Sequence, residues 1–385
     1  MKRVVIACCV LVALSFLVLP AEAGDFVRLK NKQWVVSKPE SEPPSTEDHE
    51  GSAITVLEEN YDKLVYSVKV GEKTTRQETP SDQVDEVFYY PKPEAWSVAV
   101  ADMEAGDYDS AVQGFRSLAG NSGNRAWLRM YSLYYVAKIC QSGYQWGPAV
   151  QGFEKLLNDF PKSRFAPEAL VQIGEINLNQ LDNVEAAKNA FNRLQKLTGL
   201  PEAEKQVARY YLIRIIQKQG EKAKNTSLLN QALEEYRKLL AEVEKVAELK
   251  KVATLAKLGI GNCLIHLGKF DEALTFFQSI ADTAEEKGVL ASVFNGLGLC
   301  YFRTEKWKEA LLAFLRVEVL YDDDPEQTAM SLFYSGKCFE FMAGAGIGSD
   351  NPSRARAQYA KCIARFGGTS WGQQASVARP NVRGK

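Results

Sequence analysis

The sequence predicts a mainly α-helical protein, an α-solenoid of about seven helical hairpins that follows a small all-β domain. One observation is a residue pattern that recurs along the chain: an aromatic or apolar residue, Ala three positions later, and an aromatic residue four positions after that. A second observation is a change of periodicity near residue 91, because apolar and polar residues alternate before this point. Alternation is typical of half-buried strands, and steps of three and four are typical of helices.

The recurring pattern marks the second helix of each predicted hairpin. Steps of three and four residues place its members on one face of a helix. One hairpin cannot bury that face alone, so successive hairpins must stack on one another. The copies are Tyr108–Ala111–Phe115, Trp146–Ala149–Phe153, Val184–Ala187–Phe191, Leu229–Ala232–Tyr236, Phe270–Ala273–Phe277 and Trp307–Ala310–Phe314, with a degenerate seventh at Ala355 and Tyr359.

Residues 1–23 have the pattern of a secretory signal peptide. Lys2 and Arg3 begin the segment, an apolar run follows, and Ala21-Glu22-Ala23 is a small-residue cleavage motif. We therefore expect an exported protein whose mature chain begins at Gly24 and works in the periplasm or cell envelope. The alternative is a retained membrane anchor, for which the apolar run is short.

Residues 24–90 predict the small all-β domain, either an SH3-like barrel or a sandwich. About five short runs have strand patterning. The segments with this patterning are Phe26–Leu29, Trp34–Val36, Ile54–Val56, Leu64–Val70, Lys73–Glu78 and Val84–Phe88, from which about five antiparallel strands are expected. Residues 39–51 are rich in Pro, Ser and Glu and predict a mobile acidic loop. Residues 91–93, Pro-Lys-Pro, predict the linker to the solenoid.

The predicted solenoid covers residues 94–375, and the hairpin at Leu258–Ala284 shows its pattern most clearly. Gly261 and Ala273 are small enough to let the two helices approach closely, and Gly268 suits the turn between them. Phe270 and Phe277 are expected to fill the space between this hairpin and its neighbours.

Two hairpins contain insertions. Residues 221–227 lengthen the fourth, and we expect an extended charged helix after them at 228–251. Residues 343–353 lengthen the last hairpin with a flexible glycine-rich loop. A short capping helix and then a basic, disordered tail at 376–385 are expected to end the chain.

The joint at Phe160–Leu170 predicts how one hairpin leads into the next. Pro161 ends a helix, Ser163 can cap the following one, and Ala166 and Ala169 allow it to pack closely.

Cysteine spacing predicts buried free thiols in the mature chain. Cys263, Cys300 and Cys338 occupy the same place in three successive first helices. Neighbouring packed helices lie about 8–10 Å apart, which is wider than a disulfide allows. Disulfides and a metal site were the alternatives, but two histidines, His49 and His266, provide no zinc-binding spacing.

The spacing of Gly261, Gly268, Phe270, Ala273 and Phe277 resembles the tetratricopeptide repeat family, TPR for short. The joint at Phe160–Leu170 resembles that of exported bacterial envelope members, namely the outer-membrane assembly lipoprotein and the periplasmic coordinator of the Tol–Pal machine. The resemblance implies a non-enzymatic scaffold that binds protein segments and organises cell-envelope complexes. The alternative is a structural envelope component whose helix faces form a homo-oligomer.

Other classes of function find little support in the sequence. Removing residues 1–23 changes the formal net charge from −1 to −2, which gives no basic excess for nucleic acid. No Ser-His-Asp or Cys-His set can be assembled, so neither an enzyme nor a cofactor is expected. Asp322–Glu326 lacks the spacing of a calcium loop, and it is expected to cap a helix.

The resemblance implies a peptide-binding groove lined by residues of the first helices. Candidate groove residues are Asn262, His266, Asn295, Phe302 and Arg303, with Tyr131 and Tyr134 as a second group. Asn262 matches the place of an Asn in the family's peptide-carboxylate clamp, but Leu258 stands where that clamp has Lys. An extended or helical segment is therefore expected in place of a C-terminal carboxylate. The alternative is that these residues are ordinary solvated helix positions.

Overall fold

The computed structural model describes residues 24–35, 38–39, 42–44 and 52–379. They form two compact units. The first contains the described residues up to Glu59 together with Lys63–Ser97, and the second contains Asn60–Asp62 and the described residues from Val98 onward. The expected signal peptide, most of the expected acidic loop and residues 380–385 lie outside the described residues.

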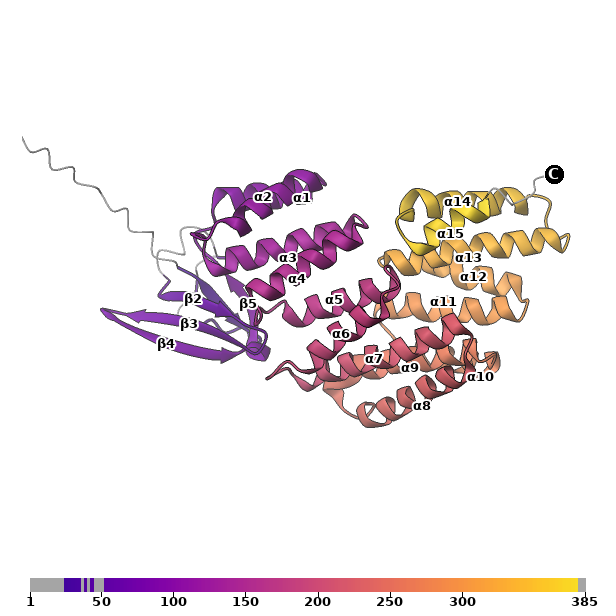
Figure 1. Ribbon diagram of the computed structural model, residues 1–385, viewed down its shortest axis with the longest axis horizontal. Helices are drawn as coiled ribbons and strands as arrows, with labels where there is room; N and C mark the ends of the chain where they lie inside the picture. Colours follow the sequence, from indigo (N-terminus) through magenta and orange to yellow (C-terminus); the bar gives the residue numbers. More distant parts are fainter. Residues whose placement is uncertain (1–23, 36–37, 40–41, 45–51, 380–385) are drawn as a thin grey trace, which may run out of the picture. The chain divides into compact units, whose positions relative to one another are not determined.

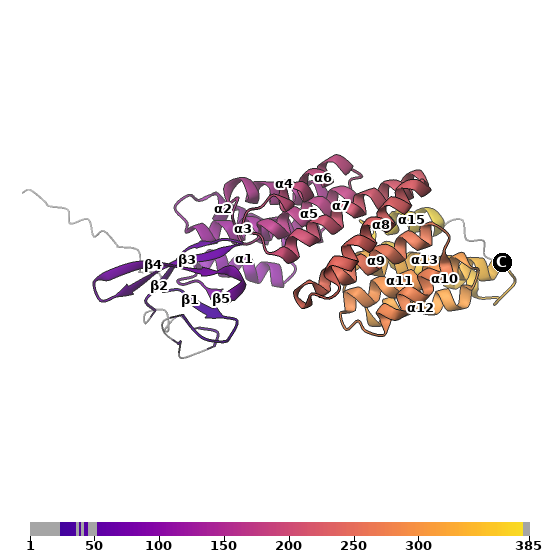
Figure 2. The same ribbon diagram turned by 90° about the horizontal axis from the view of Figure 1, so that it is seen from below.

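The first unit contains two antiparallel sheets. Its strands are β1 (Phe26–Leu29), β2 (Ile54–Glu59), β3 (Lys63–Val70), β4 (Lys73–Pro80) and β5 (Val84–Phe88). One sheet pairs β1 with β5, and the other has the order β2-β3-β4 (Figures 1 and 2). Leu64, Tyr66 and Val68 are buried along β3, as the alternation predicted. Trp34, expected to lie in a strand, makes an isolated bridge to Arg28.

The second unit is a stack of helical hairpins, as predicted (Figure 1). The first helices of the hairpins are α1 (Glu94–Glu104), α3 (Ala126–Ser142), α5 (Ala166–Asn179), α7 (Glu202–Ala223), α9 (Lys250–His266), α11 (Lys287–Arg303) and α13 (Pro325–Gly344). The second helices are α2 (Tyr108–Gly120), α4 (Trp146–Asp159), α6 (Val184–Gln195), α8 (Thr226–Val243), α10 (Phe270–Ala281), α12 (Trp307–Leu320) and α14 (Asn351–Phe366). A short helix, α15 (Ser370–Ala378), follows.

The recurring sequence pattern packs the hairpins in the predicted way. Its alanines and its second aromatic residues are all fully buried, from Ala111 and Phe115 to Ala355 and Tyr359. The Phe277 ring lies against two glycines, since a Cβ at Gly261 or Gly296 would come within 2.5 or 2.4 Å of its Cζ atom. This ring therefore packs between α9 and α11, and the missing glycine side chains leave the room for it.

Three local expectations were wrong. The charged segment at 228–251 is not one helix, because α8 ends at Val243 and α9 begins at Lys250 after a short 3₁₀ turn. Ser163 does not cap α5, whose N-cap is Phe165 and has no side-chain capping bond. Residues 376–378, expected in the disordered tail, belong to α15. The expected cap at the acidic segment is confirmed, since Asp324 accepts from the backbone N–H groups of Glu326 and Gln327.

Hairpins distant in sequence also meet within the second unit. Gln180, at the end of α5, donates a hydrogen bond of 2.6 Å to Glu326 in the first turn of α13. A second such contact lies between the start of α15 and the end of α3: a Cβ at Gly368, just before α15, would lie 2.5 Å from the Cβ of Tyr144, which follows α3. Together we call this pair of contacts the closing contact, because it joins the second and third hairpins to the last hairpin and the short segment after it.

The five cysteines of the described chain are free and buried, which confirms the prediction. Burial raises the pKa of Cys263, Cys300, Cys338 and Cys362 to about 12. Among the helices that the structure describes, none combines the length and the apolar character needed to span a membrane.

Candidate functional site

The first helices form the inner layer of the array. Contacts join α5 to α7, α7 to α9, α9 to α11 and α11 to α13, whereas the second helices mainly contact first helices. In a curved stack of hairpins, the layer whose helices approach one another lies on the concave side. We call the surface that α3, α5, α7, α9, α11 and α13 present on that side the inner wall.

The predicted site residues fall on three of these helices and do not form one cluster. Tyr131 and Tyr134 lie on α3, Asn262 and His266 on α9, and Asn295, Phe302 and Arg303 on α11.

The α3 tyrosines form an aromatic cluster with the start of α5. The Tyr134 ring stacks on Phe165 with centroids 4.0 Å apart, and Tyr131 meets the same ring edge-on at 4.8 Å. The Tyr134 hydroxyl donates to Glu168 at 2.8 Å, and Arg164 donates to the Tyr131 hydroxyl at 3.3 Å. Burial, reinforced by Glu168, raises the pKa of Tyr134, so its phenol stays neutral and acts as a donor.

The α9 residues are polar and only partly covered. Asn262 is half-buried, and His266 is exposed at the end of the helix. The Nε2 atom of His266 lies 3.3 Å from a carboxylate oxygen of Glu221 on α7. These groups can offer hydrogen bonds to the backbone of a bound segment.

Asn295 does not belong to an exposed groove, which corrects the expectation. Its side chain is 2 % exposed, and its Nδ2 donates to the backbone and side-chain oxygens of Gln327 on α13 at 2.9 and 2.8 Å. Asn295 therefore joins two neighbouring first helices. Its partner lies 32 residues further along the chain, beyond the reach of local sequence patterns.

Phe302 belongs to a second aromatic cluster, which we call the α11–α13 cluster. Its ring lies 5.1 Å from Trp307, 5.4 Å from Tyr334 and 5.5 Å from Phe341, each at an edge-to-face angle. Trp307 and Phe341 stack with centroids 4.9 Å apart. Phe341 remains 46 % exposed, and Arg303 is exposed beside Phe302 on α11.

Sequence reasoning missed Phe341, although a signal was present. Tyr334 and Phe341 are seven residues apart, which places them on one face of a helix. The glycine-rich loop was expected to begin at residue 343, which would end the helix soon after Phe341. In the structure, α13 continues to Gly344.

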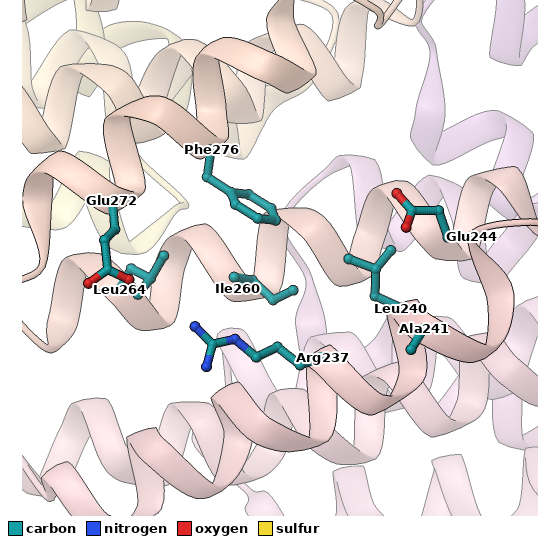
Figure 3. A pocket seen from close by; sticks show the side chains of 8 residues that line it. All are labelled: Arg237, Leu240, Ala241, Glu244, Ile260, Leu264, Glu272 and Phe276. Carbon is teal, nitrogen blue, oxygen red and sulfur yellow. The ribbon is translucent and has the colours of Figure 1, made fainter.

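A pocket of about 260 Å³ lies between α8, α9 and α10, apart from the predicted residues (Figure 3). Its apolar lining includes Leu240, Ile260 and Phe276, and the Phe276 ring points toward Ile260. Arg237, Glu244 and Glu272 supply its charged edge. Two of the three helices are second helices, so this pocket is not part of the inner wall.

Comparisons with known proteins agree with the repeat architecture. Residues 252–323, which span most of α9 to α12, match the sequence model of the tetratricopeptide repeat. A tetratricopeptide repeat protein from Parabacteroides merdae is similar in structure, with 17% identity, a TM-score of 0.49, and coverage of 75% of this chain and 97% of that one. No curated protein matches the sequence significantly.

Two further solved structures are similar at lower scores. A Rap protein complexed with competence and sporulation factor has 14% identity and a TM-score of 0.44, over 74% of this chain and 83% of its own. PilW, described as a widely conserved type IV pilus biogenesis factor, has 17% identity and a TM-score of 0.32. The match covers 73% of this chain and 96% of PilW.

Proposed function

We propose that this chain, which carries a tetratricopeptide repeat match at residues 252–323, is a non-enzymatic scaffold that binds protein segments along its inner wall. The observation that supports this most is the exposure of Phe341 at the edge of the α11–α13 cluster. Its ring is held against Trp307 and Phe302, so little conformational freedom is lost when a partner covers it. Partly exposed aromatic rings of this kind are the usual anchors of protein interfaces.

The polar residues of the wall suit the backbone of a bound segment. Asn262, His266 and Arg303 lie on the adjacent helices α9 and α11 and present amide, imidazole and guanidinium groups. The aromatic cluster of Tyr131, Tyr134 and Phe165 offers a further aromatic surface, nearer the N-terminus of the array. We infer an extended or helical ligand that places an apolar side chain on Phe341 and bonds its backbone to the polar groups.

The proposal places this scaffold in the cell envelope. It rests on the signal-peptide pattern of residues 1–23 and on the resemblance of the Phe160–Leu170 joint to envelope proteins. N-terminal sequencing of the protein from cells tests the export step, and we expect Gly24 as the first residue. A functional form that still begins with Met1 would contradict export.

The binding proposal is tested with a variant at the exposed ring. Partners captured from envelope extract by the mature chain are purified, and their Kd is measured for wild type and for Phe341→Ala. We expect the substitution to raise the Kd at least about tenfold, since it removes an anchor of about 1.4 kcal/mol or more. The double variant Asn262→Ala with Arg303→Ala tests the polar part of the wall.

Tyr108→Ala is the matched control, because Tyr108 is 50 % exposed but begins a second helix, α2. It should bind like wild type, and thermal melts of all variants should show that the fold is retained. Equal affinity of Phe341→Ala and Tyr108→Ala for the captured partner would exclude the inner wall around Phe341 as the binding surface.

A further inference from the structure

The outward face of α12 is apolar, unlike those of the other second helices. Leu312, Val319 and Leu320 are 64 %, 71 % and 54 % exposed. Among the helices that the structure describes, no other has more than one large hydrophobic residue this exposed. These exposed residues do not pack into the core of the array. The core-facing side of α12 is formed by Ala310, Phe314 and Val317, which are buried.

Leu312 and Val319 lie on one straight stripe along α12, and Leu320 lies beside it, about 100° further around the helix. Leu312 and Val319 are seven residues apart, and the half-buried Leu315 lies between them at a spacing of three and four. This is the spacing with which one helix packs along another. The positions that correspond to Leu312, Val319 and Leu320 in the preceding hairpin are the exposed polar residues Thr275, Asp282 and Thr283, so the stripe is a property of α12 rather than of the repeat.

Charged residues of opposite sign end the stripe. Lys308 precedes Leu312 by four residues on α12, and Asp322 and Asp323 follow Val319 in the turn after the helix ends at Leu320. Asp322 and Asp323 pair with Arg365 and Lys287 at 3.3 Å, and both pairs are well exposed to solvent. Exposed pairs of this kind are weak, so the carboxylates can accept a second cation.

A stripe with a basic start and an acidic end is complementary to an antiparallel copy of itself. With a two-fold axis near Leu315, the Lys308 end of one helix lies beside the Asp322 end of the other. The apolar residues then cover one another in the middle. Arg316 does not interfere, because its guanidinium lies 5.1 Å from the Phe294 ring centroid on α11.

We propose that two copies of this chain pair through α12, antiparallel and about a two-fold axis near Leu315. Isologous pairing of one surface patch with itself is the commonest way in which soluble chains dimerise. α12 has 14 residues, so the contact is short and the dimer is weak and concentration-dependent. The surface belongs to a second helix, so this proposal stands independently of ligand binding at the inner wall.

Sedimentation of the full mature chain over a wide concentration range provides the test. We expect a monomer–dimer equilibrium whose Kd rises at least about tenfold in Leu312→Gln with Val319→Gln. Val70→Gln is the matched control, since Val70 is 72 % exposed but lies on β3. A wild-type chain that stays monomeric throughout, or a dimer insensitive to the double substitution, would overturn the proposal and leave the stripe to a different partner.

Cross-linking tests the position of the axis. Leu315→Cys should form a disulfide between two copies under mild oxidation, because the two side chains meet at the axis. Val319→Cys, although more exposed, should cross-link poorly, since the two sites would be displaced by about 12 Å along the helices. The native cysteines are buried and give little background. Equal cross-linking at both positions would contradict antiparallel pairing at Leu315.

Charge reversal provides an independent check. Lys308→Glu should weaken the dimer, and adding Asp322→Lys and Asp323→Lys in the same chain should restore it. Failure of this rescue, with all variants folded, would exclude pairing of the two ends.

Discussion

Glycine–aromatic contacts decide how closely the helices pack, both within a hairpin and between one hairpin and the next. A Cβ at Gly174, Gly259, Gly298 or Gly336 would come within 2.2 to 2.6 Å of the ring of Phe191, Tyr236, Phe314 or Tyr359. Each ring comes from the recurring sequence pattern and enters the space that a missing side chain leaves. The small residue and the aromatic residue are therefore one packing unit, although they lie on different helices.

Gly261→Ala should destabilise the protein by about 1–3 kcal/mol, because the added methyl group would meet the Phe277 ring. Gly288→Ala is the control. It lies in α11 with no atom within 4 Å of an added Cβ, so it should be neutral or stabilising by up to about 1 kcal/mol. Chemical denaturation measures both, and equal stability of the two variants would contradict the packing at Gly261.

The buried thiols should be unreactive in the native protein. Burial raises the pKa of Cys263 and Cys300 to about 12, so both stay protonated at pH 8. We expect a thiol reagent to modify the mature chain only after denaturant is added. Rapid labelling of the folded protein at pH 8 would contradict this.

The raised pKa values of the buried thiols also make the free energy of unfolding depend on pH in the alkaline range. A thiol whose pKa is raised in the folded state contributes stability that is complete below its ordinary pKa of 9.0. This contribution is lost as the pH rises toward about 12, because the unfolded chain ionises first. The free energy of unfolding should therefore fall above pH 9.

Among the helices, α13 shows most clearly what a cap contributes. Asp324 accepts two backbone N–H groups at 2.9 and 3.1 Å, and Pro325 follows it at the first helical position. Asp324→Ala should therefore lower the free energy of unfolding by about 1 kcal/mol, because it removes the capping hydrogen bonds.

Asp350→Ala is the matched comparison, because Asp350 precedes α14 without a side-chain capping bond and pairs with the exposed Arg354. Asp350→Ala should lower the free energy of unfolding by less than about 1 kcal/mol, because an exposed ion pair contributes little to stability. Thermal melts compare the two variants. An equal loss would show that capping does not explain the role of Asp324.

Sequence periodicity predicted the helices well where aromatic residues and alanines repeat. Tyr108, Trp146, Val184, Phe270 and Trp307, each the first member of a copy, are the first residues of their helices. The break between Val243 and Lys250 was missed, because this charged segment contains neither Gly nor Pro. A 3₁₀ turn with ordinary helix-forming residues leaves no local signal for such a break.

The candidate site was less predictable than the fold. Phe302 and Tyr134 were expected to line a groove, but both pack in aromatic clusters whose members Phe341 and Phe165 come from other parts of the chain. Asn295 looked like an exposed wall residue, and its contact with Gln327 depends on how α11 and α13 pack. Local periodicity places a residue on a helix face, whereas its exposure depends on the next hairpin.

At the scale of the whole helical unit, the closing contact contains a partly buried carboxylate. Burial and the nearby Asp324 raise the pKa of Glu326, although Gln180 and Lys218 act in the opposite direction. A carboxyl group with a raised pKa contributes stability at low pH that is lost as the pH rises through its folded value. The charged form of Glu326 is therefore unfavourable in the folded chain at neutral pH.

Glu326→Gln should be more stable than wild type at pH 7, because it removes the charge and keeps an oxygen that can accept from Gln180. The difference should disappear below about pH 4, where the wild-type carboxyl group is protonated. Glu285→Gln, on an exposed residue between α10 and α11, is the control and should leave the stability at pH 7 within about 0.5 kcal/mol of wild type. A variant less stable than wild type at pH 7 would show that the carboxylate is required for the closing contact.

The closing contact also constrains how this chain can evolve. An array held together by nearest-neighbour contacts can gain or lose a hairpin with little effect on the others. Gln180 and Glu326 are 146 residues apart, and their hydrogen bond requires a fixed number of hairpins between them. Duplication or deletion of one hairpin between α6 and α13 would carry Glu326 away from Gln180. Relatives that keep this pair should therefore keep the same repeat number in that interval, while repeats outside it are free to vary.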